Sequence, residues 1–135
     1  MEAGYFEHDA DIGIIGRGTT VEEAFVSAAH AMFAIQAGLD AVQSRERIEL
    51  DFEEDDAELA LVRWLNALLA ASNERGMALR EFGLARAGAR WRGWALGERW
   101  RDGLVRGTEV KGATLTMLSV SRETQGWEAR CVVDV

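Results

Sequence analysis

The sequence is poor in several residues that often carry structure or chemistry. It contains no proline, a single cysteine (Cys131) and two histidines (His8 and His30). One cysteine excludes an intrachain disulfide and suits a reducing compartment. The two histidines form no Ser-His-Asp, Cys-His or paired-histidine metal motif with a useful spacing. Any chemistry must therefore be sought in other side chains.

Long apolar runs are absent as well. No stretch approaches the roughly 18 residues that a membrane span requires. The first five residues, Met1–Tyr5, lack the basic segment and following apolar run of a signal peptide. We expect a soluble, cytoplasmic protein. Its 135 residues predict one domain, spanning residues 1–135.

Positive charge is scarce and unevenly placed. The net charge is −8, and only one of the 15 basic residues is a lysine, Lys111. The segment 75–106 carries eight arginines against three acidic residues, so a basic band interrupts an acidic body. This distribution argues against direct nucleic-acid binding and is compatible with docking on a basic protein. Because lysine and arginine are not interchangeable, Lys111 is a candidate functional residue; chance is the alternative.

Two helices are predicted from capping signals and apolar spacing. Thr20 and Glu23 form a capping box, and apolar residues recur at helical spacing from there to about Ile35. The acidic run 53–56 is typical of a helix N-terminus, where the helix dipole favours negative charge. A second helix follows this run and ends near Asn73.

The remaining segments predict strands. Apolar residues alternate with charged ones over Arg47–Phe52, and Tyr5–Gly16 is an extended segment. Two hairpins follow: Ala78–Ala89 with Trp91–Trp100, and Val110–Arg122 with Trp127–Val135. Two helices packed on five to seven mostly antiparallel strands make an α+β, two-layer fold. The order of the strands is left open.

Carboxylates occur in both the first and the last strand. In an extended segment Asp9 and Asp11 point to the same side. The last strand ends on Asp134, followed by Val135 and its terminal carboxylate. Carboxylate and carbonyl oxygens bind hard cations such as Ca²⁺ and Mg²⁺. If the two strands pair, Asp11, Asp134 and Val135 converge and supply three oxygen donors; otherwise these groups are simply solvated.

Two other patterns need an interpretation. Cys131 shares a strand face with apolar residues, which favours a core position over a nucleophile. The segments 90–94 and 99–101 interleave tryptophan with arginine, as in sites for single-stranded RNA. A hairpin with tryptophans inward and arginines in water gives the same alternation and is the favoured interpretation. A partner-binding edge is a third hypothesis.

Six segments form a pattern along the chain, in this order: Phe6–Gly13, Glu22–Phe33, Leu61–Leu69, Gly97-Glu98, Glu109–Thr114 and Gly126–Val135. Together they resemble the archease family. Three departures accompany the resemblance: Asp9 replaces the usual threonine, Gly112-Ala113 replaces Ala-Val, and Leu115-Thr116 replaces Tyr-His.

The resemblance implies an accessory protein without catalytic residues of its own. Archeases assist the GTP-dependent RNA ligase of tRNA splicing and RNA repair, promoting its guanylylation and its turnover. By this resemblance Asp11 and Asp134, with Val135, would bind a divalent cation, Ca²⁺ or alternatively Mg²⁺ or Mn²⁺. His8, Asp9 and Lys111 would be accessory residues. The competing hypotheses are a metal-dependent phosphoesterase using the same aspartates and an RNA-binding or chaperone-like module using the Arg/Trp hairpin.

Overall fold

The computed structural model describes residues 3–8 and 10–135, which form two α-helices, one short 3-10 helix and eight strands. No helix in this part of the chain is long and apolar enough to cross a membrane. In chain order the elements are β1 (Gly4–His8), β2 (Asp11–Gly18), α1 (Val21–Gln36), η1 (Leu39–Ala41), β3 (Glu46–Glu53), α2 (Ala57–Arg75), β4 (Met77–Ala87), β5 (Arg90–Arg99), β6 (Gly112–Ala113), β7 (Ser119–Glu123) and β8 (Gly126–Asp134).

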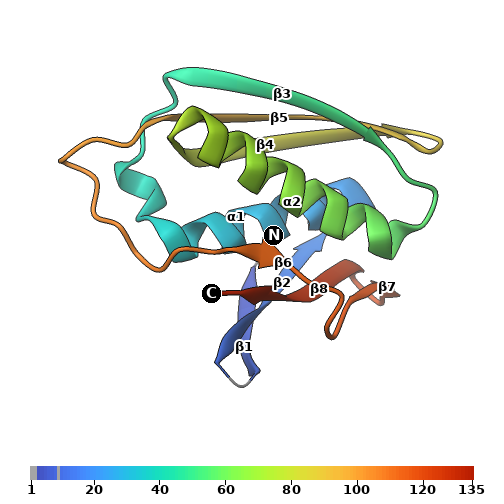
Figure 1. Cartoon of the computed structure of the whole chain (residues 1–135). Coiled ribbons are helices and arrows are strands. Elements are labelled where there is room, and N and C mark those ends of the chain that lie inside the picture. The colour runs from blue at the N-terminus through green and yellow to red at the C-terminus, as the bar shows by residue number, and fades with distance from the viewer. Residues whose placement is uncertain (1–2, 9) are drawn as a thin grey trace.

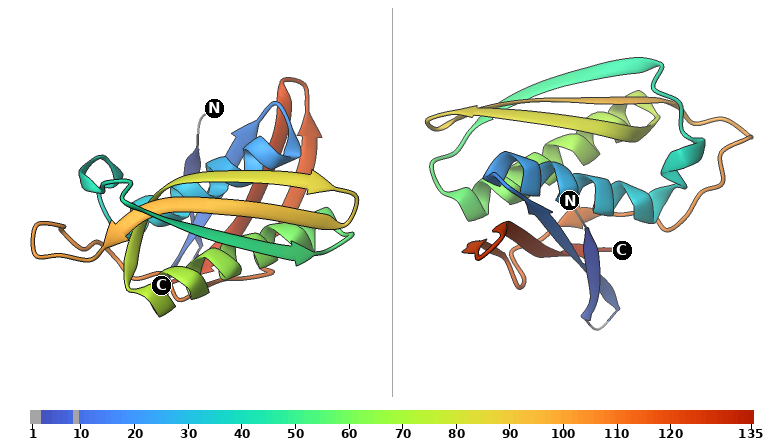
Figure 2. Two further views of the ribbon diagram at one scale, coloured as in Figure 1. Left: turned by 90° about the horizontal axis from the view of Figure 1, so that it is seen from above. Right: turned by 180° about the vertical axis from the view of Figure 1, so that it is seen from behind.

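The strands form two antiparallel sheets. In the first, here called the terminal sheet, the order is β1-β2-β8-β6, and β7 also pairs with β8. In the second, the hairpin sheet, the order is β3-β5-β4. Both helices lie between the two sheets, which is visible from opposite sides of the molecule (Figures 1 and 2). The α+β class and the packing of two helices on antiparallel sheets are confirmed. The strands are divided between two sheets, so the helices form the middle of three layers (Figure 1) where the sequence predicted two.

The helix boundaries follow the signals in the sequence. The side chain of Thr20 accepts a hydrogen bond from the Glu23 amide at 3.1 Å and caps α1. The side chain of Asp56 does the same for the Leu59 amide at 3.0 Å, so the acidic run does end in the cap of α2. Gly76 ends α2 in the left-handed conformation, with φ of 63°. A residue without Cβ adopts this conformation at least cost.

Two predicted strands are divided in the structure. The extended segment 5–16 becomes the hairpin of β1 and β2. The segment 110–122 keeps only β6 and β7, with an irregular stretch between them. In that stretch the Thr116 carbonyl accepts from the Val132 amide at 3.1 Å, and Met117 has a φ of 55°. A left-handed residue interrupts the regular ladder, which the apolar alternation alone does not reveal.

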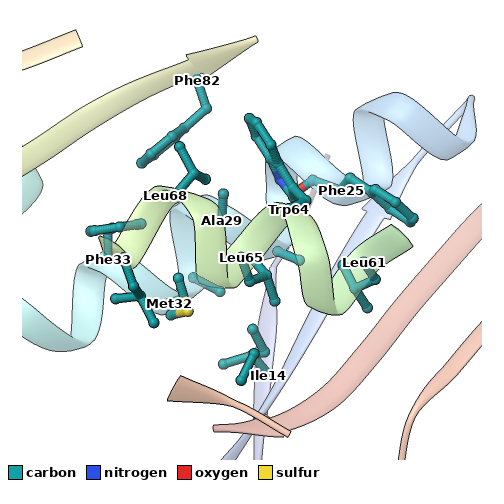
Figure 3. Packing of buried hydrophobic residues seen from close by; sticks show 14 of the residues in the cluster. Ile14, Phe25, Ala29, Met32, Phe33, Leu61, Trp64, Leu65, Leu68 and Phe82 are labelled. Carbon is teal, nitrogen blue, oxygen red and sulfur yellow. The ribbon is translucent and has the colours of Figure 1, made fainter. Parts of the chain in front are cut away.

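Trp64 of α2 links the helices to the hairpin sheet. Its side chain is fully buried, and its indole N–H donates to the Phe25 carbonyl of α1 at 3.0 Å. Phe25 in turn stacks on Trp91 of β5, with ring centroids 5.2 Å apart. On the other side, Met32 and Leu65 face Ile14 of the terminal sheet (Figure 3). One continuous core thus holds both sheets against the helical layer.

Gly16 sets how closely β2 approaches α1. A Cβ at this position would lie 2.2 Å from the Ala24 carbonyl oxygen and 2.4 Å from the Ala28 amide nitrogen. Both are backbone atoms of the helix and cannot move aside as a side-chain end can. Only glycine therefore permits this distance between the terminal sheet and α1.

We predict that Gly16→Ala destabilises the protein by roughly 1–3 kcal/mol or more, the usual cost of overpacking a core. The matched control is Gly38→Ala, since a Cβ there meets nothing within 4 Å and φ is −72°. Urea unfolding followed by circular dichroism measures both variants. Equal midpoints for the two would show that β2 and α1 can separate at little cost.

Glu98 is a buried carboxylate that joins two loops to the end of β5. Its side chain is 3% exposed and accepts from the Gln43 amide at 2.6 Å and from the Arg101 Nε at 2.7 Å. The hydrogen bond from Arg101, followed by that from Gln43, lowers the pKa of Glu98 below its ordinary value of 4.5. A carboxyl whose pKa is lowered by folding stabilises the protein above its unfolded pKa and loses this effect as the pH falls.

We predict that the stability difference between the native protein and Glu98→Gln is largest above about pH 5 and shrinks as the pH falls toward 3, because protonation removes the ionic contribution from the native protein alone. Thermal unfolding midpoints across this range measure the difference. Glu53→Gln, whose side chain is 73% exposed, is the control and should differ little from the native protein at any pH. A constant difference for Glu98→Gln would contradict the assignment.

Candidate metal site

The pairing of β2 with β8 brings the predicted carboxylates together. The antiparallel ladder ends with Ile12 opposite Val133. Asp11 and Asp134 are the next residues on either strand, so they lie opposite each other at the end of the ladder, here called the carboxylate end. The Val135 amide donates to the Asp11 Oδ1 at 3.4 Å. The strand pairing on which the sequence analysis made the convergence of Asp11, Asp134 and Val135 conditional is therefore present, while the meeting of their three oxygen donors stays a prediction.

The strands on either side of β2 and β8 place further residues beside the two aspartates. His8 of β1 pairs with Asp11, and Gly112 of β6 pairs with Asp134. Side chains directly opposite in antiparallel strands lie on the same face. Ile14 on the alternate face is fully buried against the helices, so Asp11 points to the outer face of the terminal sheet. The two aspartates consequently lie on the same outer face, where Asp134 is exposed and Asp11 is half-buried.

The chemistry of these donors fits a hard cation. Two carboxylates opposite each other repel, and carboxylate and carbonyl oxygens are the ligands that Ca²⁺ takes in proteins. Within residues 3–8 and 10–135, no three His, Cys, Asp or Glu side chains gather closely enough to hold a metal. Val135 would therefore have to act as the third donor. Asp9, the further candidate ligand, lies outside the residues that the structure describes.

Lys111 lies beside the carboxylate end. Its backbone amide donates to the Asp134 carbonyl at 2.8 Å, one residue before the Gly112–Asp134 pair. The lysine is exposed, so its ammonium is available to solvent and to a bound anion. The lone lysine of the chain thus adjoins Asp134, one of the two aspartates that the sequence analysis singled out.

Two amide side chains that the sequence analysis did not single out hold this segment. The Gln36 Oε1, at the end of α1, accepts from the Val110 amide at 3.0 Å. The Asn66 carboxamide, on α2, accepts from the Ala113 amide at 2.8 Å and donates to the Ala113 carbonyl at 3.2 Å. These contacts join residues far apart in the sequence, so periodicity gave no signal for them.

The Arg/Trp pattern resolves into a hairpin with mixed surface charge. Trp91 is fully buried, whereas Arg90 and Arg92 are exposed. Trp94 lies on the outer face of the hairpin sheet, covered by Arg47 with its guanidinium carbon 5.0 Å from the ring centroid. Acidic residues share this face, since Glu49 pairs with Trp94 and Asp51 with Arg92. The alternation arises from strand geometry, and the face lacks the continuous positive charge of an RNA-binding surface.

Cys131 lies in the core, as its strand position predicts. It is fully buried opposite Ile14, and burial raises the pKa of its thiol to about 12. A thiol that remains protonated at neutral pH is a poor nucleophile. The interpretation as a packing residue therefore holds.

Comparison with known proteins covers nearly the whole chain. Residues 4–135 match the model of the Archease protein family (MTH1598/TM1083). The archease of Sulfolobus acidocaldarius is 31% identical over 134 residues, covering 97% of this chain and 96% of the relative. The archease of Methanopyrus kandleri is 34% identical over 134 residues, covering 96% of both chains.

Solved structures agree with this likeness. The solution structure of Methanobacterium thermoautotrophicum protein 1598 superposes with a TM-score of 0.83 at 26% identity, over 98% of each chain. The crystal structure of an archease and possible chaperone from Thermotoga maritima has a TM-score of 0.65 at 21% identity, over 96% of this chain and 94% of that one, and supports the fold alone. From the family model and the near full-length relatives together, this chain belongs to the archease family.

Proposed function

We propose that this protein is a cytoplasmic, non-enzymatic activator of the GTP-dependent RNA ligase of tRNA splicing or RNA repair. Membership of the archease family supports the assignment. The observation that carries it furthest is the position of Asp11 and Asp134, opposite each other on the outer face of the terminal sheet. In this function the protein promotes guanylylation of the ligase and sustains its multiple turnover without catalysing a reaction itself.

The carboxylate end is the proposed contact with the ligase. Asp11 and Asp134, with a Val135 oxygen, would hold a divalent cation, with Ca²⁺ the first choice and Mg²⁺ or Mn²⁺ the alternatives. When bound, the cation supplies positive charge that neutralises the two aspartates and attracts phosphate oxygens. Lys111, whose backbone amide contacts Asp134, would add a second positive group near this end. An acidic end of this kind can enter a basic, metal-dependent active site and help to place metal or nucleotide there.

We predict that Ca²⁺ stabilises the native protein by about 2.7 kcal/mol at a concentration 100 times its dissociation constant, because a ligand that binds only the folded state shifts the unfolding equilibrium. Asp134→Asn should lose this effect. Without divalent cations the same variant should be slightly more stable than the native protein, since it relieves the repulsion between opposite carboxylates.

Thermal unfolding in EDTA and in Ca²⁺ measures both effects. Asp51→Asn, an exposed aspartate on the hairpin sheet, is the matched control and should respond to Ca²⁺ like the native protein. An unchanged Ca²⁺ response in Asp134→Asn would remove this residue from the proposed site.

We also predict that the protein raises multiple-turnover RNA ligation by its cognate ligase, and that Asp11→Asn or Asp134→Asn reduces the rate to near the unassisted level. The physical reason is the loss of a charged donor at the proposed contact. Joined RNA per ligase molecule is the measurement, with Asp51→Asn expected to activate fully.

The three other outcomes are informative in different ways. Full activation by the Asp134 variant would keep the activator function and discard the carboxylate mechanism. No activation under conditions where the ligase itself works would overturn the proposed function. Hydrolysis of a phosphoester by the isolated protein would instead support the phosphoesterase hypothesis.

A further inference from the structure

The strand that adjoins the carboxylate end is too short to hold itself in place. β6 consists of Gly112 and Ala113 only, and it forms one edge of the terminal sheet beside β8. Figure 1 shows β6 between β8 and α2. A strand of two residues makes few ladder hydrogen bonds, so its position depends on contacts from outside the sheet.

Asn66 supplies the contacts that a further strand would otherwise make. Its carboxamide both accepts from and donates to the backbone of Ala113, at 2.8 Å and 3.2 Å. Ala113 is only 9% exposed, so its backbone groups would lack solvent partners without this side chain. An unpaired, buried amide or carbonyl costs about 1–3 kcal/mol. Asparagine is also a poor helix former, so its place inside α2 is better explained by this contact than by helix propensity.

A second amide side chain holds the other end of the same segment. The Gln36 Oε1 accepts from the amide of Val110, whose side chain is 1% exposed. Lys111 and Gly112 lie between the two anchored residues. Their own contacts run to Asp134, through the Lys111 amide and the Gly112 pairing. Each helix therefore contributes one carboxamide side chain, Gln36 or Asn66, that holds the segment 110–113 facing Asp134.

We propose that Asn66 is a positioning residue for the carboxylate end, assisted by Gln36. Its carboxamide holds β6 against β8, and this fixes the backbone of Lys111 and Asp134 relative to each other. A shift of β6 would move Lys111 and remove the backbone partners of Asp134 without altering any proposed cation ligand. The link to cation binding rests on the proposed function; the link to the position of Lys111 and Asp134 does not.

The test compares Asn66→Leu, which keeps the side-chain volume but removes both hydrogen bonds, with Ser72→Ala. The control removes another buried hydrogen bond of α2, from the Ser72 Oγ to the Leu69 carbonyl at 3.1 Å, and leaves β6 untouched. Both variants lower overall stability. We expect only Asn66→Leu to weaken Ca²⁺ binding, by about tenfold, as outer-sphere changes around metal ligands do. Isothermal titration with Ca²⁺, at a temperature where each variant is fully folded, measures the affinity.

A second readout needs no cation. Amide hydrogen exchange of Lys111 and Ala113 reports local opening of β6, and it should become at least tenfold faster in Asn66→Leu than in Ser72→Ala. If Asn66→Leu does not fold, Gln36→Leu at the end of α1 tests the second anchor with the same expectations.

The two readouts distinguish the failures. Unchanged exchange and unchanged affinity in a folded Asn66→Leu would overturn the inference. Faster exchange with unchanged affinity would overturn the role in cation binding. If the native protein binds no Ca²⁺, the metal part of the proposed function fails, and the exchange rates alone decide whether Asn66 positions Lys111 and Asp134.

Discussion

The pairing of β2 with β8 is the constraint on which the candidate site depends. These strands contain residues about 120 positions apart in the sequence, and the amide of Val135 reaches a carboxylate of Asp11 that is 124 positions away. The register decides which side chains meet, because a slip by one residue would move every side chain to the other face. With the observed register, Ile14 and Cys131 face the core while Asp11 and Asp134 lie on the opposite, outer face. The same ladder therefore specifies the packing and the carboxylate end together.

The two helices lie between the sheets and fix the position of each sheet by direct contacts. Gly16 allows β2 to lie directly on the backbone of α1, and Trp64 fastens α2 to α1 through the Phe25 carbonyl. From this fixed layer, Gln36 and Asn66 extend to the backbone of the segment 110–113. A surface for a protein partner benefits from such rigidity, because groups that are already in place lose less conformational freedom on binding. The backbone around Asp11 and Asp134 is thus held in place by contacts with the buried helices.

Sequence patterns predicted the parts of this fold that are decided locally. The cap at Thr20 and the acidic run 53–56 mark the start of each helix by contacts within four residues; the predicted Thr20 cap is confirmed, and the acidic run does precede α2, with Asp56 as its cap. The division into two sheets was not predicted, because strand pairing depends on contacts between distant segments. The segment 110–122 shows a second limit, since the left-handed Met117 interrupts the strand although the apolar residues continue on either side of it. The meeting of Asp11 with Asp134 could be stated only as a condition. The anchoring by Asn66 could not be predicted at all, because its partner is backbone and carries no side-chain signal.

The reactivity of the Cys131 thiol depends on whether the β2–β8 ladder is intact. The only thiol of the chain lies opposite Ile14, fully buried, and it is almost entirely protonated at neutral pH. Oxidants and alkylating reagents attack the thiolate, so the closed ladder protects the protein from modification and from disulfide-linked dimers. Once the strands separate, the same thiol becomes an ordinary reactive cysteine. The rate at which Cys131 is alkylated therefore reports how often the β2–β8 ladder opens, and Asp134 lies on the same ladder.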